Sequence, residues 1–454
     1  MKRYDVIVIG AGDVGLGITF KAVSAGLKVA LINKGAVGGT CVNTGCVPSK
    51  TLIHTADRII EAGENTKLGI RSDVSSIDFS AIMERMRGVV ASGRDSIRTA
   101  LEDSEDLDLI DRECHFIDEH TLEAGDERLR GKKIFIASGA RPSVPAIKGL
   151  DTVQYLTNET VLGLKDKPES MIFIGGGFVA LEYAHFFSAM GVRVTVLNRG
   201  STLLGFEEPE ISELLRKEMG KRTELLMGTE TLEVRHTGSG YRVLVRETET
   251  VLVKELPAEQ VMVSAGRRSN ADILRPERAG IGTDKAGFIV VDDYLRTNKK
   301  HIWAIGDAIG RAMFTHAGDR EAELAWNNAT QRKKQRMDFG SVPHAVYTCP
   351  QIASVGLTES QARKEHEVLV GRAQYSDIVM GEAMLEQEGF AKAVVEKGSR
   401  RILGFHIIGP HAAMLIQEVV NAVAQKGTVE SITGCMHIFP ALSNLIPEAF
   451  GNLE

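Results

Sequence analysis

Hydrophobic and polar positions at the start of the chain predict a strand, a glycine turn, a helix and a second strand. The apolar run Tyr4–Ile9 leads into Gly-Ala-Gly-Asp-Val-Gly at residues 10–15, and a helical pattern continues through Ala25. A second apolar run, Lys28–Ile32, ends at Asn33. A Gly-x-Gly-x-x-Gly turn between a strand and a helix lets a pyrophosphate approach the helix N-terminus closely. This segment is therefore predicted to bind a dinucleotide.

The same pattern returns in the middle of the chain. The strand Met171–Ile174 precedes Gly-Gly-Gly-Phe-Val-Ala at residues 175–180, a helix follows through Met190, and Arg193–Leu197 forms the next strand. Ala180 takes the place of the third glycine, which the fingerprint tolerates. Two dinucleotide sites in one chain imply that one bound dinucleotide reduces the other.

The remaining pattern predicts an α/β protein with a different C-terminal part. Strands Lys133–Ile136 and Gln260–Val263 each end in a turn of small residues, and these paired turns are expected to be two crossings between domains. From Val342 onward, strand-like segments alternate with turns. The other predicted elements are a strand at Ile302–Ile305 and helices at Ser49–Ala62, Asp78–Leu101, about Ala412–Lys426 and near Ala441–Phe450.

Two cysteines beside the first dinucleotide unit stand five positions apart, at Cys41 and Cys46. On a regular helix their Cα atoms would lie roughly 8–9 Å apart, whereas a disulfide needs about 7 Å or less. The pair is therefore expected where a helix is distorted or just beginning, and Gly38, Gly39 and Gly45 supply the backbone freedom. A pair bonded in this way is easily reduced, which predicts a redox relay beside the dinucleotide.

The alternative interpretation of this pair is two buried thiols or half of a zinc site. No second cysteine pair or histidine pair stands at zinc-ligand spacing, which disfavours zinc. The other three cysteines, Cys114, Cys349 and Cys435, are scattered and are expected to be buried or inert.

Composition narrows the class of protein. The 454 residues are 43% hydrophobic and 25% charged, as in ordinary globular proteins, and the net charge of −6 argues against non-specific nucleic-acid binding. The sequence contains no run of about 20 apolar residues, so no membrane span is predicted. The first apolar run is too short for a signal peptide. Reversible thiol chemistry suits a reducing compartment, so we expect a cytoplasmic protein.

With these motifs assembled, the chain resembles the flavoprotein pyridine nucleotide–disulfide oxidoreductases, a group that includes dihydrolipoamide dehydrogenase, glutathione reductase and mercuric reductase. The motifs that carry the resemblance are Cys41–Lys50, Gly10–Gly15, Ala137–Gly139, Gly175–Glu182, Gly266–Arg268, Ile305–Asp307 and Tyr347–Gly356. The resemblance implies two Rossmann-like dinucleotide-binding domains and a C-terminal α+β dimerisation domain in a homodimer. The implied FAD-binding domain covers residues 1–147 and 268–335, the NAD(P)H-binding domain 148–267 and the interface domain 336–454.

The resemblance also implies roles for individual residues. Cys46 would be the thiolate that faces the flavin, Cys41 would attack the substrate, and Lys50 and Glu182 would form an ion pair beside the flavin. Phe178 stands where the family has an aromatic lid over the flavin. The residues assigned to the cofactors are Gly10, Gly12, Gly15, Asn33, Lys34, Gly39, Thr40, Cys114, Ser138, Gly139, Asp307 and Ala317 for FAD, and Gly175, Gly177, Phe178, Ala180, Asn198, Arg199 and Gly266 around the nicotinamide dinucleotide.

Both dinucleotide units depart from the family pattern at the end of their second strand. A carboxylate usually holds the ribose hydroxyls there, but this chain has Asn33 and Asn198. Asn33 can still donate and accept hydrogen bonds, so FAD is expected to bind. At Asn198, the missing acid and the adjacent Arg199 favour NADPH over NADH, because an acid would repel a 2′-phosphate and an arginine binds one.

The C-terminal segment departs from the family most seriously. Thiol–disulfide members carry a His-Pro and a nearby Glu that protonate the leaving thiol across the dimer, whereas this chain has Phe439 and Asn444 at those positions. A positioned general acid contributes about 10²–10⁴-fold to rate. His437, two residues earlier, is the only candidate substitute in this segment.

The leading functional prediction is therefore an NAD(P)H- and FAD-dependent enzyme whose Cys41–Cys46 pair reduces an acceptor that needs no strong acid. Such an acceptor is a small molecule or small protein: a metal ion, a sulfur species, a reactive disulfide or a quinone-like oxidant. The alternatives are a dihydrolipoamide dehydrogenase with an atypical base, or a mercuric or other metal-ion reductase. Mercury is less favoured because the chain ends in Phe-Gly-Asn-Leu-Glu, without a cysteine pair. A flavin-binding module without catalysis is the last alternative.

Overall fold

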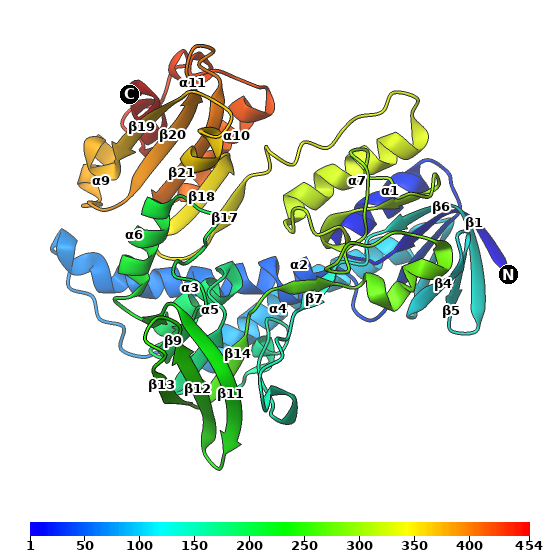
Figure 1. Cartoon of the computed structure of the whole chain (residues 1–454), viewed down its shortest axis with the longest axis horizontal. Coiled ribbons are helices and arrows are strands. Elements are labelled where there is room, and N and C mark those ends of the chain that lie inside the picture. Colours follow the sequence, from blue (N-terminus) through cyan, green and yellow to red (C-terminus); the bar gives the residue numbers. More distant parts are fainter.

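The first sheet of the computed structural model, which describes residues 1–454, is built around the N-terminal strand (Figure 1). The strand order is β3–β2–β1–β6–β5–β4, with β16 beside β6. The strands β3, β2, β1, β6 and β16 pair in parallel, and the strands β4 and β5 extend the sheet as antiparallel strands. Its strands are β1 (Lys2–Ile9), β2 (Val29–Asn33), β3 (Leu107–Asp111), β4 (Cys114–Asp118), β5 (Thr121–Ala124), β6 (Glu127–Ile136) and β16 (Ile302–Ala304).

Helices α1 and α2 begin shortly after the carboxyl ends of β1 and β2. Strand β1 is fully buried over its last residues because sheet and helices cover both its faces, which explains its unbroken apolar run. The helices are α1 (Asp13–Ser24), α2 (Gly39–Thr44), α3 (Cys46–Glu64), α4 (Phe79–Glu102) and α7 (Thr315–Thr330), with short 3₁₀ turns η1 (Asn65–Leu68), η4 (Ala271–Leu274), η5 (Pro276–Ala279) and η6 (Gly306–Ala308).

The second unit repeats the design of the first and lies below it in Figure 1. A parallel sheet of order β10–β9–β8–β14 is accompanied by an antiparallel sheet of order β11–β12–β13. The elements are β8 (Ser170–Ile174), α5 (Phe178–Ala189), β9 (Arg193–Leu197), α6 (Pro209–Met219), β10 (Glu224–Leu226), β11 (Thr229–Thr237), β12 (Gly240–Glu247), β13 (Val253–Ala258), β14 (Gln260–Val263), and the 3₁₀ turns η2 (Leu150–Thr152) and η3 (Val161–Gly163).

The two connections between these units lie side by side. The short strand β7 (Ala140–Pro142) follows the first sheet, and β15 (Arg267–Ser269) follows the second. They pair antiparallel, with Ala140 opposite Ser269. The prediction of two neighbouring crossings is thereby confirmed.

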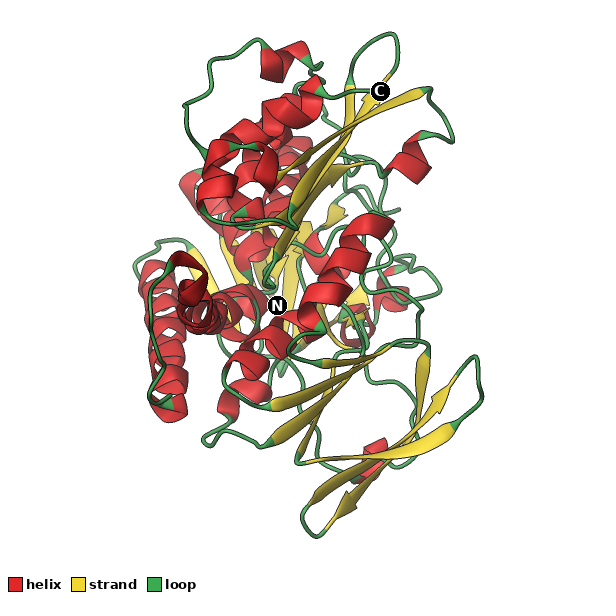
Figure 2. Cartoon of the chain, turned by 90° about the vertical axis from the view of Figure 1, so that its left-hand side faces the viewer, coloured by secondary structure: helices red, strands yellow, loops and turns green.

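The C-terminal part is an antiparallel five-stranded sheet of order β17–β18–β21–β20–β19, with helices beside it (Figures 1 and 2). The helix predicted over Ala441–Phe450 is a 3₁₀ turn followed by an α-helix. The elements are β17 (His344–Val346), β18 (Gln351–Gly356), α8 (Glu359–Ala362), β19 (Val368–Gln374), η7 (Tyr375–Asp377), α9 (Val379–Ala383), β20 (Phe390–Glu396), β21 (Ile402–Gly409), α10 (Ala412–Ala424), α11 (Glu430–Thr433), η8 (Leu442–Asn444) and α12 (Leu445–Gly451).

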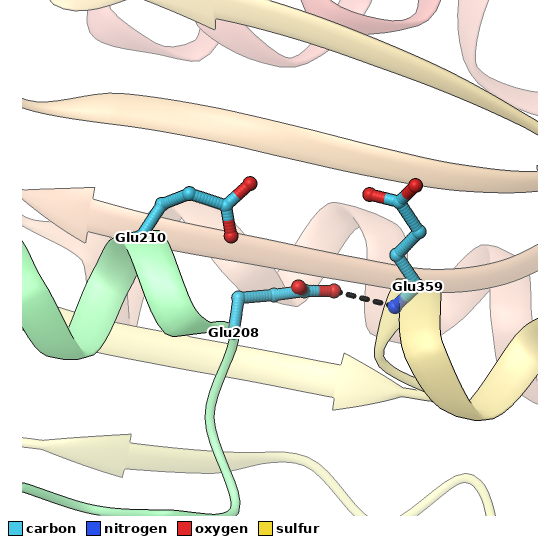
Figure 3. A group of neighbouring side chains, drawn as sticks. All are labelled: Glu208, Glu210 and Glu359. Atoms are coloured by element: carbon cyan, nitrogen blue, oxygen red, sulfur yellow. Dashed lines mark hydrogen bonds between the residues drawn. The ribbon is translucent and has the colours of Figure 1, made fainter. Parts of the chain in front are cut away.

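A buried charge cluster joins the second unit to the C-terminal sheet. Glu208 and Glu210 come from the start of α6, and Glu359 from the start of α8 (Figure 3). The Lys392 ammonium lies 2.9, 3.1 and 2.8 Å from their respective carboxylates. The lysine therefore supplies the cation that three converging carboxylates need, and it ties the two parts together.

No helix of the chain combines the length and the apolar character required to cross a bilayer.

Candidate active site

Close backbone contacts form the first glycine turn. Gly10 has a φ of +105°, and a Cβ atom there would lie 2.3 Å from the Ala137 carbonyl oxygen. A Cβ atom on Gly39 would lie 2.6 Å from the Gly12 Cα atom. Asn33 Oδ1 accepts a hydrogen bond from the Ala11 amide at 2.9 Å, so this departure from the family pattern fixes the turn. Only glycine fits at the two close approaches.

The second glycine turn has the same construction. Gly175 has a φ of +117°, and its Cβ atom would lie 2.4 Å from the Ser264 carbonyl oxygen. Asn198 donates to the carbonyl oxygens of Gly200 at 3.0 Å and Thr202 at 2.8 Å. Arg199 is exposed beside it. Asn198 and Arg199 therefore stand where the family pattern has a carboxylate, and the preference for NADPH stays a prediction.

A cavity of about 520 Å³ opens at the carboxyl ends of the first sheet. Fourteen of the predicted site residues line it: Gly10, Gly12, Asn33, Lys34, Gly39, Thr40, Cys41, Cys46, Lys50, Ser138, Gly139, Phe178, Glu182 and Asp307. The structure therefore brings most of the predicted flavin site together around the two thiols.

The other predicted site residues do not line this cavity. Gly15 packs against the Gly10 carbonyl, Ala317 is buried in α7, and Cys114 is buried in the hydrophobic core of the first sheet. Burial raises the pKa of the Cys114 thiol to about 12. The residues of the second unit, Gly175, Gly177, Ala180, Asn198, Arg199 and Gly266, lie outside the cavity wall as well.

The two cysteines flank a break between two helices. Helix α2 ends at Thr44, Gly45 has a φ of −128° and a ψ of −111°, and helix α3 begins at Cys46. The prediction of a helix that is interrupted or just starting is confirmed. Both residues are free thiols in this structure. Cys46 Sγ lies 3.7 Å from Thr315 Oγ1, which α7 contributes from much later in the chain.

The neighbouring groups shift the pKa values of the two cysteine thiols in opposite directions. The hydrogen bond donated by Cys41 lowers the pKa of Cys46, and the Thr315 hydroxyl and the Lys50 charge lower it further. The same hydrogen bond raises the pKa of Cys41, with burial and the Asp13 charge adding to the effect. Cys46 is therefore the sulfur that carries the thiolate when the pair is reduced.

The cation near Cys46 is held by a buried carboxylate. Lys50 Nζ lies 2.8 Å from Glu182 Oε2, and the Glu182 side chain is only 5% exposed. Glu182 also accepts a hydrogen bond from the Tyr347 amide at 3.1 Å. The ammonium lies 4.6 Å from the centre of the Tyr347 ring, a cation–π distance. These contacts hold the Lys50 charge beside the thiol.

Removal of this cation should shift the protonation of Cys46. We expect the long-wavelength absorbance of the reduced, FAD-loaded protein to persist below the ordinary thiol pKa of about 8.5 and to fade as the pH falls. Lys50→Met should raise the midpoint by about one pH unit or more, since a nearby positive charge is lost. Lys67→Met, at an exposed lysine of η1, is the matched control. A midpoint unmoved by Lys50→Met would contradict the assignment.

Two neighbouring aromatic residues, Phe178 and Phe314, line the same cavity as the two cysteines. The rings of Phe178 and Phe314 are 6.1 Å apart, and His344 stacks on Phe314 at 5.9 Å with an interplanar angle of 12°. His344 Nε2 lies 2.5 Å from Glu207, which precedes α6 of the second unit. The predicted lid residue Phe178 therefore packs on an aromatic stack that reaches the contact between the second unit and the C-terminal sheet.

A buried hydroxyl without a partner shows that this cavity fits a polar group such as a flavin nucleotide. Ser138 Oγ lines the cavity and is buried without a hydrogen-bond partner. Burial raises the pKa of the Asp307 carboxyl, which lies 3.4 Å from Arg267 Nε. Backbone amides at the start of α1 and the close glycine turn suit a pyrophosphate.

The C-terminal segment holds Phe439 and Asn444 at the positions of the family's acid–base pair. Phe439 is 72% exposed, and Asn444 accepts a hydrogen bond from the Ala441 amide within its own turn. His437 Nε2 pairs with Glu418 at 2.7 Å, and Nδ1 lies 3.2 Å from the Cys435 carbonyl. Both ring nitrogens are engaged within this chain, so His437 does not present a free acid. Of the three cysteines expected to be buried or inert, Cys435 is exposed and therefore not buried.

The sequence reasoning missed three residues of this site. Thr315 contacts Cys46, the Tyr347 ring covers Lys50, and Arg267 reaches Asp307. Tyr347 and Arg267 stand in motifs that the resemblance already used, which was the available signal. Thr315 follows the predicted Asp307 by eight positions, and nothing in its local pattern predicts a contact with a cysteine.

Two glycine turns, a flavin-sized cavity and a polarised dithiol define a flavoprotein oxidoreductase with two dinucleotide sites. Residues 4–322 match the family described as pyridine nucleotide-disulphide oxidoreductase, and residues 342–450 match its dimerisation domain. The chain belongs to the pyridine nucleotide–disulphide oxidoreductase family. Its members are FAD-dependent enzymes with NAD(P)H as the electron donor. The match to the dimerisation domain supports the predicted homodimer.

The similar proteins differ in their acceptors. The chain is 33% identical over 432 residues to a mercuric reductase of Staphylococcus aureus, covering 95% of this chain and 79% of that protein. It is 33% identical to a mycothione reductase of Mycobacterium tuberculosis, with both chains fully covered. A solved structure of the HOCl-induced flavoprotein disulfide reductase RclA from Escherichia coli, as a Cu(II) complex, superimposes with a TM-score of 0.88 at 27% identity, covering 99% of each chain.

Proposed function

We propose that this enzyme takes electrons from NADPH, passes them through FAD to the Cys41–Cys46 disulfide, and uses the resulting dithiol to reduce an acceptor that needs no partner-supplied acid. FAD, held by the cavity-lining residues named above, would supply hydride acceptance from the nicotinamide and transfer of the electron pair to the disulfide. NADH is the second donor candidate, since Arg199 is the sole cation at the end of β9.

The polarised dithiol is the observation that carries this proposal. Cys41 donates its S–H hydrogen to Cys46, while Thr315 and the Lys50 charge stabilise the Cys46 thiolate. Cys46 would face the flavin and Cys41 would be the sulfur that meets the acceptor. In this proposal, residues 1–147 and 268–335 bind FAD, residues 148–267 bind NAD(P)H, and residues 336–454 form the interface domain. The cofactor roles are those assigned to individual residues above.

The dithiol reaction balances without an external acid when the leaving group is stable as an anion. With a disulfide acceptor, Cys41 transfers its proton to Cys46 or solvent and its thiolate attacks one acceptor sulfur, so a mixed disulfide forms and the first thiolate leaves. Cys46 then attacks the Cys41 sulfur, which closes the Cys41–Cys46 disulfide and releases the second thiolate. Two electrons pass to the acceptor, and both leaving groups take protons from solvent or the thiols.

A metal ion is the second candidate acceptor, and a specific observation favours it. A soft ion that leaves two thiolates needs no proton, which suits Phe439 and Asn444 at the positions of the usual dyad. The similarity to a mercuric reductase and to a reductase solved as a Cu(II) complex supports the same class. Dihydrolipoamide turnover is disfavoured, because His437 is held by Glu418.

Anaerobic titration of the FAD-loaded protein with NADPH, and separately with NADH, tests the proposal. We expect a long-wavelength absorbance band after addition of two electrons, because the Cys46 thiolate would lie against oxidised flavin. NADPH should produce it at lower concentration than NADH. Direct bleaching of the flavin without this band would show that the dithiol is disconnected and would overturn the proposed relay.

A further inference from the structure

A buried histidine forms the centre of a polar chain that the proposed relay does not use. The His185 side chain of α5 is fully buried, and its Nε2 atom lies 2.8 Å from Asp57 Oδ1 of α3. Its Nδ1 atom lies 3.0 Å from Arg222 Nη1, in the turn between α6 and β10. Arg222 Nη2 also donates to the Cys349 carbonyl at 2.9 Å. Asp57, His185 and Arg222, the His185 chain, thus form one hydrogen-bonded series that ends on the backbone after β17.

The partners of His185 fix the position of its ring hydrogen. A guanidinium has only donors, so the Nδ1 atom must accept the hydrogen bond from Arg222. The ring hydrogen therefore lies on Nε2 and is donated to the Asp57 carboxylate. Both ring nitrogens have partners inside the protein, and the neutral imidazole connects an anion to a cation. The arrangement suits a side chain that holds its neighbours in place.

The His185 chain connects the same two helices as the Lys50–Glu182 pair. Helices α3 and α5 pack against each other (Figure 1). Asp57 follows Lys50 by seven positions on α3, which is about two helical turns and places both on one face. His185 follows Glu182 by three positions on α5, about one turn along the same face. The two helices are therefore joined at two places, once by the ion pair and once by the histidine.

The segment between β17 and β18 contributes to both sets of contacts as well. The Tyr347 amide donates to Glu182 at 3.1 Å, and the Tyr347 ring lies 4.6 Å from the Lys50 ammonium. Two positions later, the Cys349 carbonyl accepts the hydrogen bond from Arg222. Each segment that holds the ammonium beside the dithiol is thereby fixed a second time by the His185 chain.

We propose that the His185 chain positions the Lys50 ammonium beside the Cys46 thiolate. The inference rests on the proposed function, because it concerns the charge that stabilises the thiolate of the relay. No member of the chain lines the cavity, so all three side chains act through their neighbours and not on the acceptor. They are positioning residues, and their loss should change the chemistry of the thiol as well as the stability of the protein.

The direction of this change follows from the groups that surround Cys46. The hydrogen bond from Cys41 lowers the pKa of Cys46 most, and Thr315 and the Lys50 charge lower it further, while burial and the Glu182 charge oppose them. The influence of the lysine exceeds that of its glutamate partner. An ammonium that is held less firmly stabilises the thiolate less, so loss of the His185 chain should raise the pKa of Cys46.

The pH dependence of the Cys46 thiolate tests the inference. One readout is the midpoint of the long-wavelength band in the reduced, FAD-loaded protein. A second is the midpoint of Cys46 alkylation by iodoacetamide, located by mass spectrometry, which does not depend on the flavin relay. His185→Leu keeps a side chain of comparable size and removes both hydrogen bonds. We expect it to raise both midpoints by about half a pH unit or more.

Variants of Asp57 separate the hydrogen bond from the charge. Asp57→Ala and Asp57→Asn remove the same charge, but only the asparagine keeps an oxygen that accepts from Nε2 of the histidine. Asp57→Ala should raise both midpoints, and Asp57→Asn should leave them at the values of the unmodified protein. His301→Leu is the matched control, because His301 also bonds through Nε2, to the Glu119 carbonyl at 2.8 Å, but lies outside the cavity wall. It should change neither midpoint.

The outcomes distinguish this inference from the proposed function. Unmoved midpoints in folded His185→Leu or Asp57→Ala, with or without a loss of stability, overturn the positioning role. An equal rise in Asp57→Ala and Asp57→Asn overturns it too, because the hydrogen bond would then not matter. The Asp57 side chain is 27% exposed, so its variants decide the question if His185→Leu does not fold. An unmodified protein without the long-wavelength band overturns the relay, and the alkylation midpoints then still decide the positioning role.

Discussion

Cys41→Ser is expected to lower acceptor reduction on the order of 10³-fold or more while flavin reduction by NADPH continues. The reason is chemical: the proposed dithiol needs two sulfurs, and removal of a nucleophile from a catalytic unit commonly costs several orders of magnitude. The Cys46 thiolate would remain beside Lys50 and Thr315 in this variant. The long-wavelength band should therefore appear in Cys41→Ser without any addition of NADPH. The pKa of Cys46 should be higher in this variant, because the Cys41 hydrogen bond that lowers it is lost.

Two further variants complete this experiment. Cys46→Ser should abolish both acceptor reduction and the long-wavelength band, since it removes the sulfur that Thr315 contacts. Cys435→Ser changes an exposed thiol of the C-terminal segment and should leave both readouts at the level of the unmodified protein. Acceptor reduction that survives Cys41→Ser would mean that electrons leave directly from the flavin.

Most of the fold could be predicted because its signals are local in the sequence. Each dinucleotide unit is a contiguous strand, turn and helix, and the glycines at residues 10 and 175 mark positions where a Cβ atom would strike a carbonyl oxygen. The helix predicted from Ser49 begins earlier, at Cys46, because Gly45 ends α2 and allows α3 to restart at once. Boundaries of this kind depend on a single backbone conformation, which composition does not fix.

The parts of the site that could not be predicted are contacts between distant segments. Thr315 reaches Cys46 across 269 positions, and Tyr347 packs its ring on Lys50 across nearly 300. Neither contact has a periodic or compositional signal of its own.

The charge cluster around Lys392 is a further contact between distant segments that the sequence alone does not predict. A lysine inside a strand would ordinarily be expected on a solvent-exposed face, yet the inner residues of β20 are all buried and the Lys392 side chain is 1% exposed. Glutamates from α6 and α8 compensate its charge, and they come from segments about 184 and 33 positions away in sequence. The cluster decides how the second unit is held against the C-terminal sheet, which positions the contact between Glu207 and His344.

Lys392→Met is therefore expected to destabilise the protein by about 3–5 kcal/mol, because removal of the lysine leaves the buried Glu208 carboxylate without its cation. The free energy of unfolding, from urea titration of the holoenzyme followed by circular dichroism, measures the loss. Lys217→Met is the matched control, since Lys217 also links α6 to the C-terminal part, through Glu388 at 2.6 Å, but is 54% exposed. An exposed pair of this kind contributes about 1 kcal/mol or less. Equal losses in the two variants would contradict the role assigned to Lys392, whereas partial recovery on adding Glu208→Gln to Lys392→Met would show that the uncompensated charge, and not lost packing, causes the destabilisation.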